Sequence, residues 1–351
     1  MIELTKPDFI AGDENKFVDF IKKIDKNDKV ALVSHVADLD GVISAKIVNE
    51  ILNPEIIRFA DYHEINKNFA LELKKQNSKI VIITDLMIRD VEFVKEIEKF
   101  AKLLIIDHHV FEIDFNSEKT LFFNSDGFCA AYLSYYLFSK IQNLEKYDWL
   151  VAAASVSDWT YKKNGSWMTA IYEKYKQNYI SDIDGIKKSK IYDIVLYLSR
   201  AIVYFRAKEN DVKTVFNKIE CGKFGYISDL EKYAKIVAKE IKRILNNFEK
   251  EKIIFNDGFY YEFETNFPIK SIISTQLSEM YLNKTVIIAS KKDNYLTLSA
   301  RRQDGKVDTN KLMQKMIQGL SDASAGGHFK ATGGYILFED AEEFKKRLQN
   351  L

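Results

Sequence analysis

Short apolar runs alternate with helical segments over the first 160 residues. The apolar runs cover residues 29–34, 56–60, 78–84 and 102–106. The segments between them, such as GVISAKIVNEIL and VEFVKEIEKFA, repeat apolar residues every three or four positions, which is typical of amphipathic helices. Apolar strands that alternate with helices predict a parallel sheet with helices on both faces. We therefore expect an N-terminal α/β domain.

The rest of the chain divides into a helical part and a second set of strands. From about residue 130 to 250 the apolar spacing is helical, and the last helical segment is long and highly charged. Strand-like runs then return, together with helical segments at 269–282 and 308–319. We predict an N-terminal catalytic domain at 1–245, which includes a helical connector, a linker at 246–265, and a smaller C-terminal α/β domain at 266–351.

Acids and histidines follow three of the predicted N-terminal strands. They are His35, Asp38 and Asp40 after the first strand, Asp85 after the third, and Asp107, His108 and His109 after the fourth. Carboxyl ends of parallel strands share one edge of a sheet, where open α/β sheets bind ligands. The sequence therefore predicts that these side chains lie close together.

This set of side chains favours a metal site. Carboxylates and imidazoles bind Mn²⁺, Zn²⁺ and Fe²⁺, and a carboxylate between two ions permits a two-metal centre. Asp158, in a helical stretch, is a further candidate ligand. A single acid after a strand is more often a helix cap or part of a turn. We interpret His63 as an ordinary core histidine.

Composition narrows the function classes. The 351 residues carry a net charge of +1 and 46% hydrophobic residues, which argues against a nucleic-acid coat protein or a membrane-surface protein. The two cysteines lack metal-type spacing. The apolar stretch at 194–205 is too short to span a bilayer, and the first residues lack a signal-peptide pattern. We expect a cytoplasmic protein without membrane association.

Several ordered motifs resemble those of the DHH phosphoesterase superfamily. SHVADLDGVISA, ITDL, the Asp107–His109 triplet and SVSDW resemble its four N-terminal motifs in order. AGGHFKATGG (325–334) and SAR (299–301) resemble the glycine-rich loop and the strand arginine of the C-terminal domain associated with DHH proteins. DHH alone is a weak signal, but the ordered set is specific and spans residues 34–334.

The resemblance implies two Mn²⁺ ions, for which Mg²⁺ or Co²⁺ could substitute. His35, Asp38 and Asp85 would hold one ion. The second ion would be held by Asp40, Asp85, His108 and Asp158, with Asp85 bridging. Asp107 would orient an imidazole, and His109 would face the phosphate or leaving group.

The resemblance also implies a substrate site in the C-terminal domain. Gly326, Gly327 and His328 would bind a phosphate, and Arg301 would bind a phosphate or carboxylate, across an interdomain cleft from the metals. The implied activity is Mn²⁺-dependent phosphodiester hydrolysis of short oligoribonucleotides or dinucleotides, similar to that of nanoRNases. Phosphoadenosine phosphate and cyclic dinucleotides are further candidate substrates, and a homodimer is compatible with the sequence.

Three departures from the family pattern bear on these expectations. Only Val36 and Ala37 separate His35 from Asp38, where many relatives have three residues, so these two ligands are less secure than the others. Ala325 and Cys129 also depart from the usual residues, at positions that would affect substrate contacts.

Two other functions remain open at this point. A RecJ-type single-strand exonuclease usually has an added oligonucleotide-binding domain, for which this length leaves little room. A catalytically inactive nucleotide-binding module is the second alternative.

Overall fold

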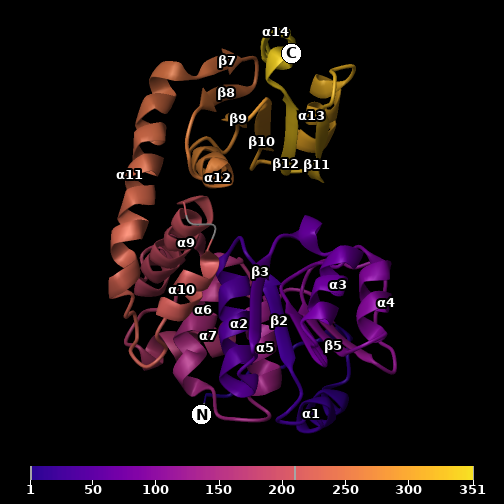
Figure 1. Ribbon diagram of the computed structural model, residues 1–351. Coiled ribbons are helices and arrows are strands. Elements are labelled where there is room, and N and C mark those ends of the chain that lie inside the picture. The colour runs from indigo at the N-terminus through magenta and orange to yellow at the C-terminus, as the bar shows by residue number, and fades with distance from the viewer. Residues whose placement is uncertain (1, 209–210, 351) are drawn as a thin grey trace. The chain divides into compact units, whose positions relative to one another are not determined.

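The computed structural model describes residues 2–208 and 211–350, which divide into two compact units, Met1–Ala234 and Lys235–Leu351 (Figure 1). Each unit contains a six-stranded sheet and its own helices. The predicted α/β class, with a smaller second unit, is confirmed.

The first sheet has the strand order β1-β6-β5-β4-β2-β3. Its strands are β1 Phe9–Ala11, β2 Val30–His35, β3 Ile56–Ala60, β4 Ile80–Thr84, β5 Lys102–Asp107 and β6 Thr120–Ser125. Strands β2 to β6 are parallel, as predicted, whereas β1 pairs with β6 in the antiparallel direction. The sequence did not predict β1 or β6, because a strand of three residues such as β1 is too short to display a period of two.

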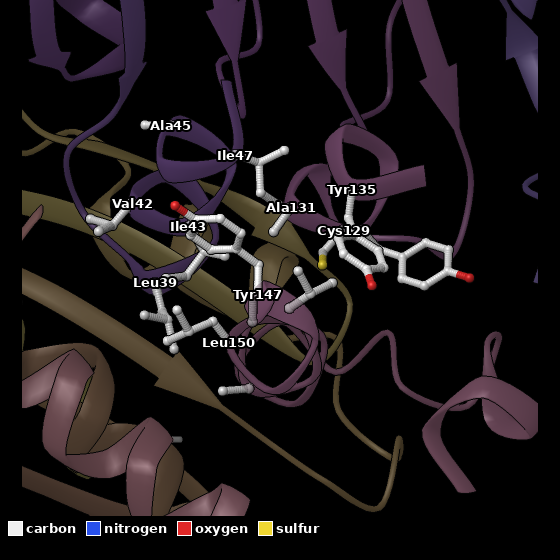
Figure 2. Packing of buried hydrophobic residues seen from close by; sticks show 14 of the residues in the cluster. Leu39, Val42, Ile43, Ala45, Ile47, Cys129, Ala131, Tyr135, Tyr147 and Leu150 are labelled. Carbon is white, nitrogen blue, oxygen red and sulfur yellow. The ribbon is translucent and has the colours of Figure 1, made fainter. Parts of the chain in front are cut away.

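Helices cover both faces of this sheet because its central strands are apolar on both sides. Leu32 and Ile82 point into a core built with helices α2 Leu39–Leu52, α5 Ala130–Phe138 and α6 Asp148–Ser157. Val33 and Ile83 point to the opposite side, against α3 Lys67–Lys75 and α4 Val91–Glu98. Figure 2 shows the first of these cores, with side chains of α2, α5 and α6 in contact.

The other helices of the first unit contribute side chains to the first of these cores. They are α1 Glu14–Lys22, α7 Gly165–Lys174, α8 Ile183–Lys187, α9 Lys190–Lys208 and α10 Val212–Lys218, with short 3₁₀ turns η1 Tyr62–Glu64 and η2 Glu145–Tyr147. The apolar stretch at 194–205 forms the middle of α9 and packs in this core. Among the described residues, no helix has the length and apolar content needed to cross a bilayer.

The second sheet is mixed, with the order β11-β12-β10-β9-β8-β7, and only β8 and β9 run parallel. Its strands are β7 Ile253–Phe255, β8 Gly258–Phe263, β9 Thr285–Lys292, β10 Tyr295–Arg301, β11 Ser324–His328 and β12 Ala331–Leu337. Its helices are α12 Lys270–Met280, α13 Thr309–Ile317 and α14 Ala341–Gln349, with a 3₁₀ turn η3 Phe338–Asp340.

The predicted linker at 246–265 contains regular structure. Helix α11 runs from Ser228 to Glu251 and crosses the division between the units, and β7 and β8 follow it. Gly258 lies so close to the neighbouring strand that an added Cβ would meet the Thr285 carbonyl oxygen at 2.2 Å. Pairing with β9 therefore makes this segment an integral part of the second sheet.

Candidate metal centre and phosphate-binding hairpin

The predicted acids and histidines meet at one edge of the first sheet. Strands β5, β4 and β2 are neighbours, and their carboxyl ends are in register: Ser34 pairs with Thr84, which pairs with Ile106. His35, Asp85 and the Asp107–His109 triplet therefore leave the sheet side by side. Asp158 joins them from the end of α6.

Asp85 lies between two groups of potential ligands. Its Oδ2 is 3.5 Å from Nδ1 of His35, which is itself 2.9 Å from Oδ2 of Asp38. Its Oδ1 is 3.3 Å from Nε2 of His108. The same His108 nitrogen lies 3.7 Å from Asp40 Oδ2 and 3.5 Å from Asp158 Oδ2. The structure thus brings together all six residues that the sequence singled out as metal ligands.

The carboxylate of Asp40 is fixed by a helix that begins 90 residues later in the chain. The backbone amides of Ala130 and Ala131, at the start of α5, each donate a 2.7 Å hydrogen bond to one of its oxygens. These free amides of a helix N-terminus favour an anion. Asp40 is thereby oriented toward His108 by contacts that the sequence did not reveal.

Gly41 permits the close approach of α2 to the end of β2. A Cβ at this position would lie 2.4 Å from the carbonyl oxygen of His35. Ser34 also donates a 2.6 Å hydrogen bond to the Gly41 carbonyl oxygen. Asp38 caps α2 by accepting from the Gly41 amide with Oδ1, which leaves Oδ2 for His35. Asp38 is therefore both a helix cap and part of the cluster.

The cluster has the features expected of a cation site. Within the described part of the chain, His35 Nδ1 and Asp85 Oδ2 are buried and lack a partner with hydrogen-bond geometry. Asp85 and Asp40 are each only 1% exposed, and a buried carboxylate is costly unless a positive charge compensates it. A divalent cation would supply that charge and would complete the contacts of both unpaired atoms. The donor set therefore fits the ions implied by the sequence.

The pKa values of the carboxyl groups reflect the same crowding. Burial, and then the charge of Asp38, raises the pKa of Asp85 well above its usual range. Burial and the charge of Asp85 raise the pKa of Asp40 to about 8, and burial and Asp40 raise that of Asp158 to about 7. Closely spaced carboxylates disfavour one another's ionised form, and a bound cation favours it.

The second histidine of the triplet is held by Asp107 and by a tyrosine. Asp107 Oδ1 lies 2.8 Å from His109 Nδ1, so Asp107 orients this ring. On the other side, the Tyr62 hydroxyl lies 3.1 Å from His109 Nε2. Tyr62 also stacks against His35, with ring centroids 4.5 Å apart.

Sequence reasoning missed Tyr62, although its position follows the same pattern. It begins η1 directly after β3, whose carboxyl end lies beside β2. Its position just after a strand was the available signal, but the search for acids and histidines passed over a tyrosine. The interpretation of His63 as a core residue is wrong, because its side chain is 80% exposed on the same short turn.

The predicted glycine-rich loop of the second unit is a β-hairpin. Gly326 pairs with Gly333, and Gly327 pairs with Thr332. Gly327 has φ +154°, and an added Cβ there would meet the Ala331 carbonyl oxygen at 2.5 Å, so glycine is needed for this strand pairing. The hairpin tip is attached to α13, because the Thr309 hydroxyl donates to the Phe329 carbonyl oxygen at 3.0 Å.

Arg301 and His328 lie at the same end of this sheet. Ala331 of β12 pairs with Arg301 on one side and with His328 on the other. Gly326 and His328 are exposed, and Arg301 is half-buried. Arg301 and His328 are thus presented on the two strands that flank β12, beside a backbone with little side-chain cover.

The structure separates the roles of two neighbouring arginines that the sequence left equivalent. Arg302 is only 3% exposed and pairs with Asp304 and Asp257 at 2.7 and 2.6 Å. The Arg301 guanidinium instead donates from Nε to the Ser274 hydroxyl at 3.1 Å. Arg302 therefore stabilises the fold, and Arg301 has donors available for a ligand.

Two known protein families match this chain, one in each of its two units. The pattern of the DHH family, N-terminal domain, matches residues 29–156, and that of the DHHA1 domain matches residues 251–351. The chain belongs to the DHH superfamily. Members of the DHH family are metal-dependent phosphoesterases and nucleases. The candidate metal ligands lie in the DHH part, apart from Asp158 two residues beyond it, and the hairpin lies in the DHHA1 part.

Solved structures share this DHH fold at low sequence identity. RecJ from Thermus thermophilus in complex with Mn²⁺ has a TM-score of 0.64 and 11% identity, covering 100% of this chain and 55% of RecJ. The pGpG-specific phosphodiesterase PggH from Vibrio cholerae has a TM-score of 0.55 and 15% identity, covering 92% and 98%. CDC45 from Entamoeba histolytica has a TM-score of 0.61 and 10% identity, covering 96% and 98%.

These likenesses establish the fold. The chain spans about half the length of the Thermus RecJ that it matches. A search of curated protein sequences gives no match.

Proposed function

We propose that this protein is a Mn²⁺-dependent phosphodiesterase that hydrolyses short oligoribonucleotides or dinucleotides. The observation that carries the proposal is the position of Asp85, whose two oxygens face His35 and His108 in separate ligand groups. A shared carboxylate is typical of two-metal phosphoryl transfer sites. Phosphoadenosine phosphate and cyclic dinucleotides belong to the same class of substrate.

His35, Asp38 and Asp85 would hold one ion, and Asp40, Asp85, His108 and Asp158 would hold the other. When bound, the ions would neutralise charge on the phosphoryl group and lower the pKa of the attacking water. Mg²⁺ or Co²⁺ could bind to the same oxygen and nitrogen donors.

His109 would donate a proton to the departing oxygen from Nε2. Burial lowers the pKa of His109, but Asp107 outweighs this effect and raises the pKa to about 9, which favours the protonated ring. The Asp107 carboxylate accepts from Nδ1 and fixes the ring plane. General acids positioned in this way typically contribute rate factors of about 10² or more.

The hairpin of the second unit would bind a phosphate of the substrate. Gly326 and Gly327 expose backbone to a ligand, because no Cβ intervenes, and His328 and Arg301 supply donors. A site for one terminal group suits a short substrate. The two free cysteines are compatible with a reducing cytoplasm, where we expect the protein to act, alone or as a homodimer.

The alternative is a single-strand exonuclease, which the likeness to RecJ favours. An inactive nucleotide-binding module is a weaker alternative, because such a module has no need for the complete set of buried ligands. Hydrolysis of substrates of graded length separates these functions.

The test uses purified protein with Mn²⁺ and five substrates: a dinucleotide, a five-nucleotide RNA, a 24-nucleotide strand, a cyclic dinucleotide and phosphoadenosine phosphate. We expect mononucleotide release mainly from the two shortest RNAs. Preference for the 24-nucleotide strand would instead establish the exonuclease. No hydrolysis of any substrate by metal-loaded protein would contradict a phosphodiesterase of this class.

Asp85→Asn provides the inactive reference. Asp85 has φ +57°, a conformation that asparagine tolerates, so the variant removes the charge while preserving the backbone. Turnover should fall by at least about 10³-fold, or ~4 kcal/mol in the barrier. Asp293→Asn is the matched control, because Asp293 has φ +54° on an exposed turn of the second unit. Activity of Asp85→Asn within about tenfold of the parent would refute the bridging role.

A further inference from the structure

Trp159 is an unusual residue in this structure. Of the three tryptophans, Trp149 and Trp167 are each 1% exposed, whereas Trp159 is 46% exposed. Its backbone is also left-handed, with φ +59°. Large non-glycine residues rarely adopt this conformation, which costs about 1 kcal/mol or more. A large, partly exposed indole on such a backbone therefore suggests a role beyond folding.

The turn that carries Trp159 is well defined. The Trp159 amide donates to the Val156 carbonyl oxygen at 3.3 Å, and the Thr160 amide donates to that of Ser155 at 2.9 Å. The indole ring lies 6.2 Å from the ring of Tyr161, which is buried. The turn therefore holds the indole in a fixed place at the end of α6.

The turn begins at a candidate metal ligand. Asp158 directly precedes Trp159, and its Oδ2 lies 3.5 Å from Nε2 of His108. The Asp158 side chain is 30% exposed, so this part of the cluster is open to solvent. Lys162 and Lys163, on the same turn, are exposed cations. An aromatic face, two positive charges and an open metal-ligand carboxylate thus occur within six residues.

We propose that Trp159 is the stacking surface for a nucleobase of the substrate whose scissile phosphate lies at the metal centre. The inference rests on the proposed nucleotide hydrolysis and assigns it a specificity-determining residue. An indole offers a large face to a planar base, and stacking of this kind tolerates sequence but strengthens with the size of the base. We therefore expect purine nucleotides to be preferred over pyrimidine nucleotides beside this residue.

Binding can be tested by fluorescence without turnover. Because the other two tryptophans are buried, iodide should quench mainly Trp159. In Mg²⁺, adenosine monophosphate should shield this residue from iodide, whereas ribose 5-phosphate, which lacks the base, should not. Unchanged iodide quenching up to millimolar adenosine monophosphate would overturn the proposal. This measurement does not depend on hydrolysis, so it decides the stacking role even if the protein cleaves none of the proposed substrates.

Kinetics provide the second test through a matched pair of substrates. One is an adenine dinucleotide, and the other has the same backbone without bases. Trp159→Gly removes the ring at a position where glycine adopts φ +59° without strain, so the variant should fold at least as well as the parent. We expect the ratio of kcat/KM for the dinucleotide to that for the abasic compound to fall about tenfold, which equals ~1.4 kcal/mol. Trp159→Phe, which keeps an aromatic face, should recover most of this ratio.

The outcomes separate the two proposals. If Trp159→Gly lowers kcat/KM for both compounds equally, the residue acts only by positioning Asp158, and stacking is refuted. If Trp159→Gly changes neither kcat/KM nor the ratio between the two compounds, stacking is also refuted. The proposed hydrolysis is then unaffected. If the parent hydrolyses neither compound, the proposed function fails, and the iodide experiment alone decides on Trp159.

Discussion

His109 is held at both ring nitrogens, by Asp107 at Nδ1 and by the Tyr62 hydroxyl at Nε2. Tyr62 in addition packs against His35, so one side chain contacts both a candidate metal ligand and the candidate general acid. A ring whose two nitrogens are both contacted has little freedom to rotate. At the scale of the residue, the arrangement therefore preorganises proton transfer.

Replacing Tyr62 by phenylalanine tests this arrangement. The variant keeps the ring that packs on His35 but loses the hydroxyl contact with His109. Loss of one such hydrogen bond is worth about 0.5–1.5 kcal/mol, so kcat should fall about two- to tenfold with little change in KM. Tyr226→Phe, at an exposed tyrosine of the same unit, should leave kcat unchanged. An unaltered kcat in Tyr62→Phe would mean that Asp107 alone orients His109.

At the scale of the element, the junction of β2 and α2 places three candidate ligands within six residues. His35 ends β2, Asp38 caps α2, and Asp40 lies in its first turn. The sharp turn requires the chain to pass within contact distance of its own strand, which Gly41 allows. The short spacing between His35 and Asp38 does not separate them, since His35 Nδ1 is 2.9 Å from Asp38 Oδ2.

Gly41→Ala should disturb this junction. The added methyl group would lie 2.4 Å from the His35 carbonyl oxygen, which is backbone and cannot rotate away. We expect a loss of ~1–3 kcal/mol in the free energy of unfolding, measured in urea, together with weaker Mn²⁺ binding measured by calorimetry. Gly165→Ala, in α7 where an added Cβ meets nothing within 4 Å, should be neutral or slightly stabilising. Equal stability of both variants would contradict a steric role for Gly41.

The Arg302–Asp304 pair at the end of β10 gives a prediction for pH. The hydrogen bond from Arg302 lowers the pKa of Asp304 to about 2, below the value near 3.9 of an unfolded aspartate. A lowered folded-state pKa stabilises the fold above pH ~4, and this stabilisation is lost as the pH falls through ~2. Asp304→Asn should therefore be less stable than the parent at pH 7, and the difference should shrink between pH 4 and 2. A difference that stays constant over this range, followed by urea unfolding, would refute the ion pair.

At the scale of the whole molecule, the two candidate sites belong to separate units. All six candidate metal ligands lie in Met1–Ala234, whereas Arg301 and the hairpin lie in Lys235–Leu351. Metal binding is therefore expected to stabilise the first unit directly.

Hydrogen exchange followed by mass spectrometry tests this division. Mn²⁺ should slow amide exchange at residues 35–41, 84–86 and 106–109 and leave β11 and β12 unchanged. At 100 times its dissociation constant, an ion that binds only the folded state adds ~2.7 kcal/mol of stability. EDTA should reverse the protection, and Asp85→Asn should abolish it. Protection confined to the second unit would place the metal elsewhere.

The sequence by itself determined the α/β class, the strand-end positions of the candidate ligands and the family resemblance. These features follow from local periodicity and from the rule that the carboxyl ends of parallel strands lie at one edge of the sheet. They can therefore be predicted without knowing which distant residues are in contact. Tyr62 also follows a strand, β3, but its residue type is not a metal ligand of the kind that the pattern identified. The structure brings His35 and Asp38 together despite their short spacing, and their role as metal ligands stays a prediction.

Only the tertiary structure decided the contacts that depend on distant segments. The amides that fix Asp40 come from α5, about 90 residues away, and no local pattern encodes which helix end faces which acid. Arg301 and Arg302 are adjacent and chemically identical, yet Arg301, the last residue of β10, donates to Ser274, whereas Arg302, just after the strand, donates to Asp257. The glycine-rich segment pairs as a hairpin because a neighbouring strand, β10, supplies hydrogen bonds to one side of it. In each case the contact is made with a segment that is distant in sequence. The sequence specifies such a contact only through the complete fold.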